Sequence, residues 1–64
     1  MTASILTHEE FNKLTPKQMQ GYMALRRRFK RKPESMYYDH ILGCLMVHYA
    51  GIWIGVEKDG YTHS

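Results

Sequence analysis

Cysteine is nearly missing from this chain of 64 residues, which contains one, Cys44. A single cysteine forms no disulfide within the chain, and no Cys-x-x-Cys pair is present to hold a structural zinc ion. A lone cysteine is also typical of a reducing compartment, so we expect a cytoplasmic protein. Because so short a chain buries only a thin core, its stability has to come from well-formed helix ends, aromatic packing or a second chain.

Long hydrophobic runs are missing as well. Segment 41–56 has no formal charge, but its length is below the roughly 20 residues that a membrane-spanning helix needs. Three glycines and His48 interrupt it further. The first six residues show neither the cationic start nor the apolar stretch of a signal peptide. We therefore expect one domain over residues 1–64 and no insertion into a membrane.

The motifs of common enzyme classes are also missing. The chain has no glycine-rich phosphate loop, no His-Glu-x-x-His and no serine in a nucleophile elbow. Cys44 with His40 or His48 forms a nominal nucleophile and base. The apolar neighbours of Cys44, however, are expected to raise the pKa of its thiol and make it unreactive. We expect no enzymatic activity and no cofactor.

What the chain does contain is a dense cationic run, Arg26-Arg27-Arg28-Phe29-Lys30-Arg31-Lys32. The run holds six of the nine lysines and arginines, so a chain with net charge +3 has a remainder with net charge −3. A mildly acidic body with one cationic segment is typical of a protein that contacts a polyanion.

Two helix starts are well marked. Thr7-His8-Glu9-Glu10 and Thr15-Pro16-Lys17-Gln18 both have the pattern of a capping box, and Pro16 stands at a favourable first helical position. Leu6 with Phe11, and Leu14 with Met19, have the spacing of hydrophobic staples. We expect a short helix at 8–14 and a longer one at 16–31, which ends before Pro33 and has the cationic run in its last turns. On this helix Arg26 and Lys30 project near the apolar stripe, so we expect them to be partly internal, with Glu34 and Asp39 as the nearest acidic partners.

The second half of the chain allows two readings. Segment 34–42 suits a third helix with Gly43 as its C-cap. Alternating apolar residues at 45–49 and 52–56, with Ala50-Gly51 between them, predict a β-hairpin. The alternative continues one helix from 34 to about 50 and gives an all-α helical hairpin. We favour the first reading, a small α+β domain of two or three short helices followed by a C-terminal β-hairpin, a turn at Asp59-Gly60 and a flexible tail at 61–64.

The alternative reading has one chemical consequence. On a continuous helix, His40, Cys44 and His48 would share a face, with Asp39 beside it, and would resemble a transition-metal site. The hairpin separates them. Because ligand-type residues at helical spacing often occur by chance, we expect no metal.

Function follows from the cationic run and the aromatics near it. Clustered Arg and Lys bind phosphates, and nearby tyrosines stack on unpaired bases. The leading expectation is a small basic accessory protein that binds nucleic acid through its phosphate backbone. The residues expected at this site are Arg26, Arg27, Arg28, Lys30, Arg31, Lys32, Tyr37 and Tyr38, with Phe29 and Tyr22 as further stacking candidates.

A second expectation is a protein-binding adaptor or inhibitor. Such a protein, of the size common in viral and mobile-element genomes, would dock its cationic edge on an acidic surface of a nucleic-acid-handling enzyme. Trp53 is the expected core anchor, and Trp53, Tyr49 and Met46 are residue types favoured at protein interfaces. If the hairpin lies at an edge of the sheet, it also offers a surface for a homodimer.

Overall fold

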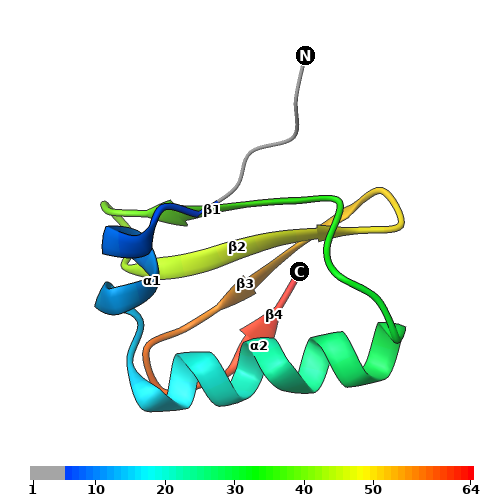
Figure 1. Ribbon diagram of the computed structural model, residues 1–64, viewed down its shortest axis with the longest axis horizontal. Helices are drawn as coiled ribbons and strands as arrows, with labels where there is room; N and C mark the ends of the chain where they lie inside the picture. The colour runs from blue at the N-terminus through cyan, green and yellow to red at the C-terminus, as the bar shows by residue number, and fades with distance from the viewer. Residues whose placement is uncertain (1–5) are drawn as a thin grey trace.

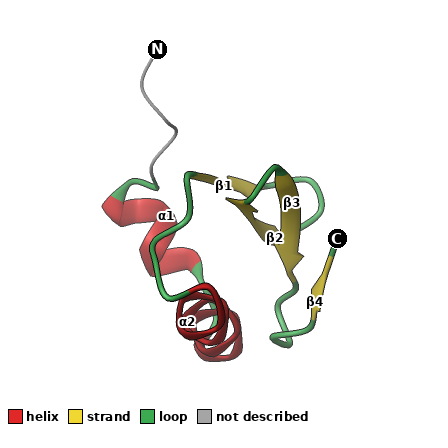
Figure 2. Ribbon diagram, turned by 90° about the vertical axis from the view of Figure 1, so that its right-hand side faces the viewer, coloured by secondary structure: helices red, strands yellow, loops and turns green. Residues whose placement is uncertain are grey.

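The computed structural model describes residues 6–64, in which one layer of helices lies against one layer of sheet (Figures 1 and 2). The elements are α1 His8–Lys13, α2 Pro16–Phe29, β1 Ser35–Asp39, β2 Cys44–Tyr49, β3 Ile52–Val56 and β4 Thr62–His63. The four strands form an antiparallel sheet in the order β1-β2-β3-β4. The predicted α+β class is therefore confirmed, and the all-α alternative is wrong.

Both helices begin where the sequence predicts. At α1 the hydroxyl of Thr7 accepts a hydrogen bond from the Glu10 N–H, and the Glu10 carboxylate accepts one from the Thr7 N–H. Thr15 and Gln18 exchange the same pair of bonds at α2. Each capping box satisfies backbone groups that a helix start otherwise leaves unpaired. α2 ends at Phe29, two residues earlier than predicted, because Lys30 adopts the left-handed conformation with φ 58°.

The predicted third helix at 34–42 is wrong, because this segment contains β1. Met36 and Tyr38 point to the same side as their partners Val47 and Leu45 on β2, and that pairing satisfies the backbone of the segment. Gly43, expected as a helix C-cap, is in the turn that joins β1 to β2, with φ 71°. The side chain of Asp39 holds this turn by accepting hydrogen bonds from the N–H groups of residues 41 and 42.

The predicted hairpin is confirmed as β2 and β3, joined by a turn in which Ala50 and Gly51 both have positive φ. It lies in the middle of the sheet and not at an edge. The predicted turn at Asp59-Gly60 is also present, closed by a hydrogen bond from the Gly60 N–H to the Glu57 carbonyl. Within segment 61–64, expected as a tail, Thr62–His63 forms β4 and pairs with the end of β3.

The core lies between α2 and the face of the sheet turned toward the helices. Its buried side chains are Leu6, Tyr22, Leu25, Met36, Leu45, Val47, Tyr49 and Val56. Because side chains alternate along a strand, the residues between these point to the opposite side. Figure 2 shows that no helix covers that opposite side of the sheet.

The start of α2 is attached to the sheet by a polar contact. Gln18 is fully buried, and its amide nitrogen donates to the carbonyl oxygens of Gly43 and Val56, both at 3.1 Å. Its amide oxygen accepts from the Thr15 N–H, so the same side chain caps the helix and joins it to two strand ends. A buried amide with all these partners fixes the position of α2 on the sheet, since losing a partner leaves a buried polar group unsatisfied.

Candidate functional site

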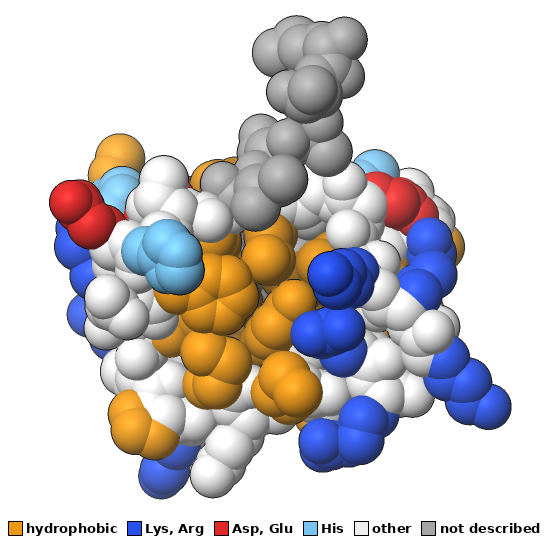
Figure 3. Space-filling model, in the orientation of Figure 1, with side chains coloured by type: hydrophobic (Ala, Val, Ile, Leu, Met, Phe, Trp, Pro, Cys, Tyr) orange, Lys and Arg blue, Asp and Glu red, His pale blue; other side chains and the backbone are white. Residues whose placement is uncertain are grey.

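The cationic run surrounds the C-terminal end of α2. Arg26, Arg27 and Arg28 form the last turn of the helix, Lys30 is the C-cap, and Arg31 and Lys32 lie in the loop that leads to β1. We call these six residues the cationic cluster. Cations at this end of a helix complement the partial negative charge of the helix dipole, which favours the placement energetically. Figure 3 shows several Lys and Arg side chains on the right of the molecule, where α2 ends.

Five of the six cations are exposed, and Arg26 is half-buried. The expectation that Arg26 is partly internal is confirmed, and the same expectation for Lys30 is wrong. The guanidinium of Arg26 lies 5.9 Å from the ring centre of Tyr22, and that of Arg31 lies 5.6 Å from the ring centre of Tyr49. These rings hold the two side chains at the surface of the core while their charges stay accessible to solvent.

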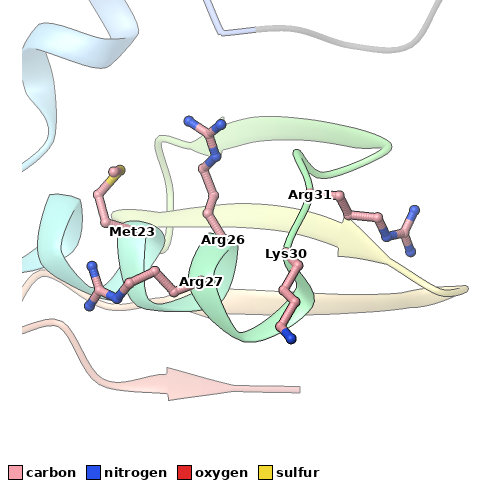
Figure 4. A pocket seen from close by; sticks show the side chains of 5 residues that line it. All are labelled: Met23, Arg26, Arg27, Lys30 and Arg31. Carbon is pink, nitrogen blue, oxygen red and sulfur yellow. The ribbon is translucent and has the colours of Figure 1, made fainter.

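Four members of the cationic cluster border a shallow depression of about 290 Å3, which is lined by Met23, Arg26, Arg27, Lys30 and Arg31. Figure 4 shows that the four charged side chains fan out from the helix end and do not converge on one point. A converging set would suit one small anion held from all sides. A fan of cations suits an extended partner with several negative charges along its length.

Glu34 makes the one ion pair with the cationic cluster within residues 6–64. Its carboxylate lies 2.9 Å from a guanidinium nitrogen of Arg31, so it pairs with Arg31 and not with Arg26 or Lys30 as expected. The hydrogen bond from the Ala50 N–H, followed by the contacts with Arg31, lowers the pKa of the Glu34 carboxyl. The other expected partner, Asp39, caps the turn after β1 instead.

Tyr37 and Tyr38, which we expected together at the site, are neighbours in β1 and point to opposite sides of the sheet. Tyr37 points to the open side of the sheet and is exposed, whereas Tyr38 is half-buried on the helix side with its ring beside His40. Tyr22 is buried, and the ring of Phe29 stacks on Tyr49 at 4.3 Å between centres. Of these four aromatics, Tyr37 alone remains open to a partner.

Trp53 is not the core anchor that we expected, because it also lies on the open side of the sheet. It is 40% exposed, its indole stacks on His48 at 4.8 Å, and the ring of Tyr37 meets it edge-on at 5.3 Å. The side chains on this side of strands β1 to β4 include Tyr37, Met46, His48, Trp53 and His63, which we call the aromatic face. The sequence alone could have predicted this position. Trp53 alternates with Ile52, Ile54 and Val56 along the strand, so its side chain points to the side opposite theirs.

The other two residues expected at a protein interface have different surroundings. Tyr49 is fully buried, and its hydroxyl donates to the Arg31 carbonyl at 2.8 Å, so it supports the loop of the cationic cluster from inside. Met46 is half-buried on the aromatic face. For a homodimer, β2 is paired on both sides, and β4 covers β3 only at Gly55 and Val56, which leaves the outer edge of residues 52–54 without a partner strand in the described part of the chain.

The nominal metal and nucleophile residues are not brought together. His40 lies in the turn after β1, and Cys44 and His48 stand at opposite ends of β2. Across residues 6–64 no group of three His, Cys, Asp or Glu side chains has the arrangement of a metal site. Burial, followed by the charges of Glu57 and Asp39, raises the pKa of the Cys44 thiol, as the sequence predicted.

Neither α1 nor α2 has the length and apolar character needed to cross a bilayer.

Two surfaces stand out on the described chain, the cationic cluster at the end of α2 and the aromatic face of the sheet. They meet at the edge of the molecule where Arg31, Glu34 and His48 are in contact. Comparison with family models, with curated proteins and with solved structures finds no match to this chain.

Proposed function

We propose that this protein binds nucleic acid through the phosphate backbone, with the cationic cluster as the contact surface. The observation that carries the proposal is the fan of four cations around the depression at the end of α2 (Figure 4). Phosphates spaced along a chain match such a fan, and each neutralised phosphate releases counterions that drive binding. Backbone contacts of this kind give affinity without reading the base sequence.

The chemistry of the side chains supports the same conclusion. Four of the six cations are arginines, whose planar guanidinium groups donate forked hydrogen bonds that match phosphate oxygens. Within residues 6–64 one ion pair, between Arg31 and Glu34, competes for these donors. Most of the cationic cluster is therefore available for a partner.

The experiment measures the affinity for a labelled oligonucleotide at several salt concentrations, comparing two triple variants with the same change in net charge. One replaces Arg27, Arg28 and Lys32 with Ala, and the other replaces the three cations outside the cluster, Lys13, Lys17 and Lys58. We expect the plot of log K against log salt to lose about two to three units of slope in the first variant and to change little in the second. We expect replacement of Arg26, Arg27, Arg28 and Arg31 together to nearly abolish binding.

Equal losses in the two triple variants would show that net charge alone drives binding, and binding that ignores salt would exclude a phosphate contact. Circular dichroism and thermal unfolding check that each variant remains folded. The second candidate function, docking on an acidic protein surface, is favoured by the partly exposed Trp53 beside the cationic cluster, since Trp and Arg are common at interface centres. A protein partner that co-purifies in fixed stoichiometry after nuclease treatment would favour it over nucleic-acid binding.

A further inference from the structure

The aromatic face gives the surface next to the cationic cluster a second chemistry. We propose that the nucleic acid is single-stranded and that its unpaired bases stack on Trp53 and Tyr37. This inference rests on the proposed function and adds the substrate class, since phosphate contacts alone do not distinguish single strands from duplexes.

The first support is the exposure of the two rings. Trp53 and Tyr37 are 40% and 42% exposed, although Met36 beside Tyr37 is in the core and Ile54 beside Trp53 packs against it. No helix within residues 6–64 covers this side of the sheet (Figure 2). Their rings lie 5.3 Å apart with an angle of 65° between their planes, so the tyrosine forms a wall beside the indole. Because His48 already stacks on one side of the indole, a base stacks on the parts of the two rings that remain exposed.

The second support is a continuous set of contacts from the cationic cluster to these rings. The Arg31 guanidinium lies 2.9 Å from Glu34, and the other Glu34 oxygen lies 3.2 Å from Nδ1 of His48. The His48 ring then stacks on Trp53. A nucleic-acid strand whose phosphates contact Arg31 and Lys32 is therefore separated from the aromatic face only by the side chains of Glu34 and His48.

The charge distribution supports a polyanion at this end of the aromatic face. Asp39 and Glu57 stand at the other end of the strands, where Asp39 pairs with Cys44 and Glu57 follows β3. These carboxylates disfavour phosphates there. Near His48 and Trp53 the nearest carboxylate is Glu34, which is paired with Arg31, and the six cations of the cluster outnumber it. Phosphate attraction and exposed rings thus coincide at one end of the sheet.

Stacking distinguishes single strands from duplexes because paired bases already stack on one another. Their flat faces are then closed to side chains, whereas an unpaired base presents its face to an aromatic ring. Trp53 and Tyr37 therefore add affinity for single strands alone. They do so for any base, since every base has a flat aromatic face.

The experiment uses the full chain and its single tryptophan, Trp53, as a fluorescent reporter. An oligothymidylate of about 15 nucleotides, its duplex with oligoadenylate, and heparin as a polyanion without bases are titrated in turn at one salt concentration. We expect the single strand to bind about tenfold more tightly than the duplex and to quench the indole emission strongly. Heparin is expected to bind with little quenching.

Variants then test the two rings against a matched control. Trp53→Ala and Tyr37→Leu are expected to lower single-strand affinity by about tenfold each and to leave heparin affinity unchanged, whereas Trp53→Phe retains most of it. Ile52→Ala is the control, because Ile52 is exposed on the same strand but points to the other side of the sheet. If Trp53→Ala fails to fold, the quenching of the unaltered protein and the Tyr37→Leu variant still decide.

Two outcomes overturn this inference while the proposed function stands. One is equal affinity for single strand and duplex with no quenching, and the other is an unchanged single-strand affinity in both ring variants. Loss of a stoichiometric protein partner in Trp53→Ala, with single-strand binding unchanged, would also overturn it and would make the aromatic face a protein-docking surface. Failure to bind any of the three polyanions would instead remove the proposed function itself.

Discussion

Glu34 is the residue at which the cationic cluster meets the sheet. Its carboxylate contacts the Arg31 guanidinium, Nδ1 of His48 and the N–H of Ala50. It therefore orders the loop before β1, but it also places a negative charge where we propose that phosphates bind. A side chain with both effects has opposite consequences for stability and for binding.

Glu34→Gln tests these two effects together. Removing the carboxylate frees Arg31 and removes a repulsive charge, so we expect the affinity for oligothymidylate to rise about two- to fivefold at low salt. The pKa of Glu34 is lowered in the folded protein, first by the Ala50 N–H and then by Arg31, so its stabilising contribution is present above the ordinary value of 4.5. That contribution disappears as the pH falls through the lowered folded value.

Unfolding by urea at a series of acidic pH values measures the second effect. The stability of the unaltered protein should decrease more steeply with falling pH than that of Glu34→Gln. Glu9→Gln serves as a control, because Glu9 is exposed and makes no ion pair within residues 6–64. Parallel pH curves for all three proteins, or a weaker affinity in Glu34→Gln, would contradict this account of Glu34.

At the scale of elements, α2 approaches the turn between β3 and β4 closely through Gly21. A methyl group at this position would lie 2.8 Å from a methyl carbon of Val56 and 2.9 Å from the carbonyl oxygen of Gly60. Gly60 in turn lies over the backbone of Lys17, with φ 90°. The helix and this turn are therefore in contact through glycine on both sides.

The direction in which Gly21→Ala changes the free energy of unfolding tests this packing. In an exposed helix the change from Gly to Ala stabilises by about 0.5–1 kcal/mol. Here we expect a net loss of about 1–3 kcal/mol, because the added methyl group pushes the helix off the turn. Urea unfolding measures it, with Gln20→Ala on the exposed side of α2 as a control that should stay within about 0.5 kcal/mol. A stabilised Gly21→Ala would show that the helix and turn separate freely.

The elements that the sequence predicted are those whose signals are local. Thr7 and Thr15 each cap a helix with a residue three positions later, and the β2–β3 hairpin needs only its alternation and the Ala50-Gly51 turn. β1 was predicted as a helix because its strand conformation depends on pairing with β2, a contact that segment 34–42 does not encode by itself. For the same reason, the sequence alone does not predict that Tyr37 and Tyr38 point to opposite sides of the sheet.

The candidate site was predictable to a similar extent. The six cations and their place at the end of a helix follow from the charge run and from Pro33. Residue type alone predicts Trp53 in the core, but its position in the alternation of β3 puts it on the other side of the sheet. Tyr49 was assigned to an interface by type as well, and only the packing of α2 on the sheet shows that it is buried.

At the scale of the whole molecule, the cationic cluster and the buried thiol of Cys44 lie toward opposite ends of the sheet. Cys44 begins β2, is almost fully buried and has Sγ 3.6 Å from the sulfur of Met46. Because the thiol is almost fully buried, a reagent reaches it only when the structure around the start of β2 opens. The rate of thiol modification therefore reports on how far the structure around β2 must open.

We expect native Cys44 to react slowly with a disulfide reagent near neutral pH, because burial, with Glu57 and Asp39, raises the pKa of the thiol and opening is rare. The rate should increase with urea along the slope of global unfolding. An oligonucleotide at about 100 times its dissociation constant should slow the reaction, by about 100-fold at most, because the contiguous cationic run can also bind the unfolded chain and reduce the effect. A rate that urea leaves unchanged would show that β2 becomes accessible through a local fluctuation. Oligonucleotide that binds without slowing the reaction would place the opening in a part of the sheet that the ligand does not hold.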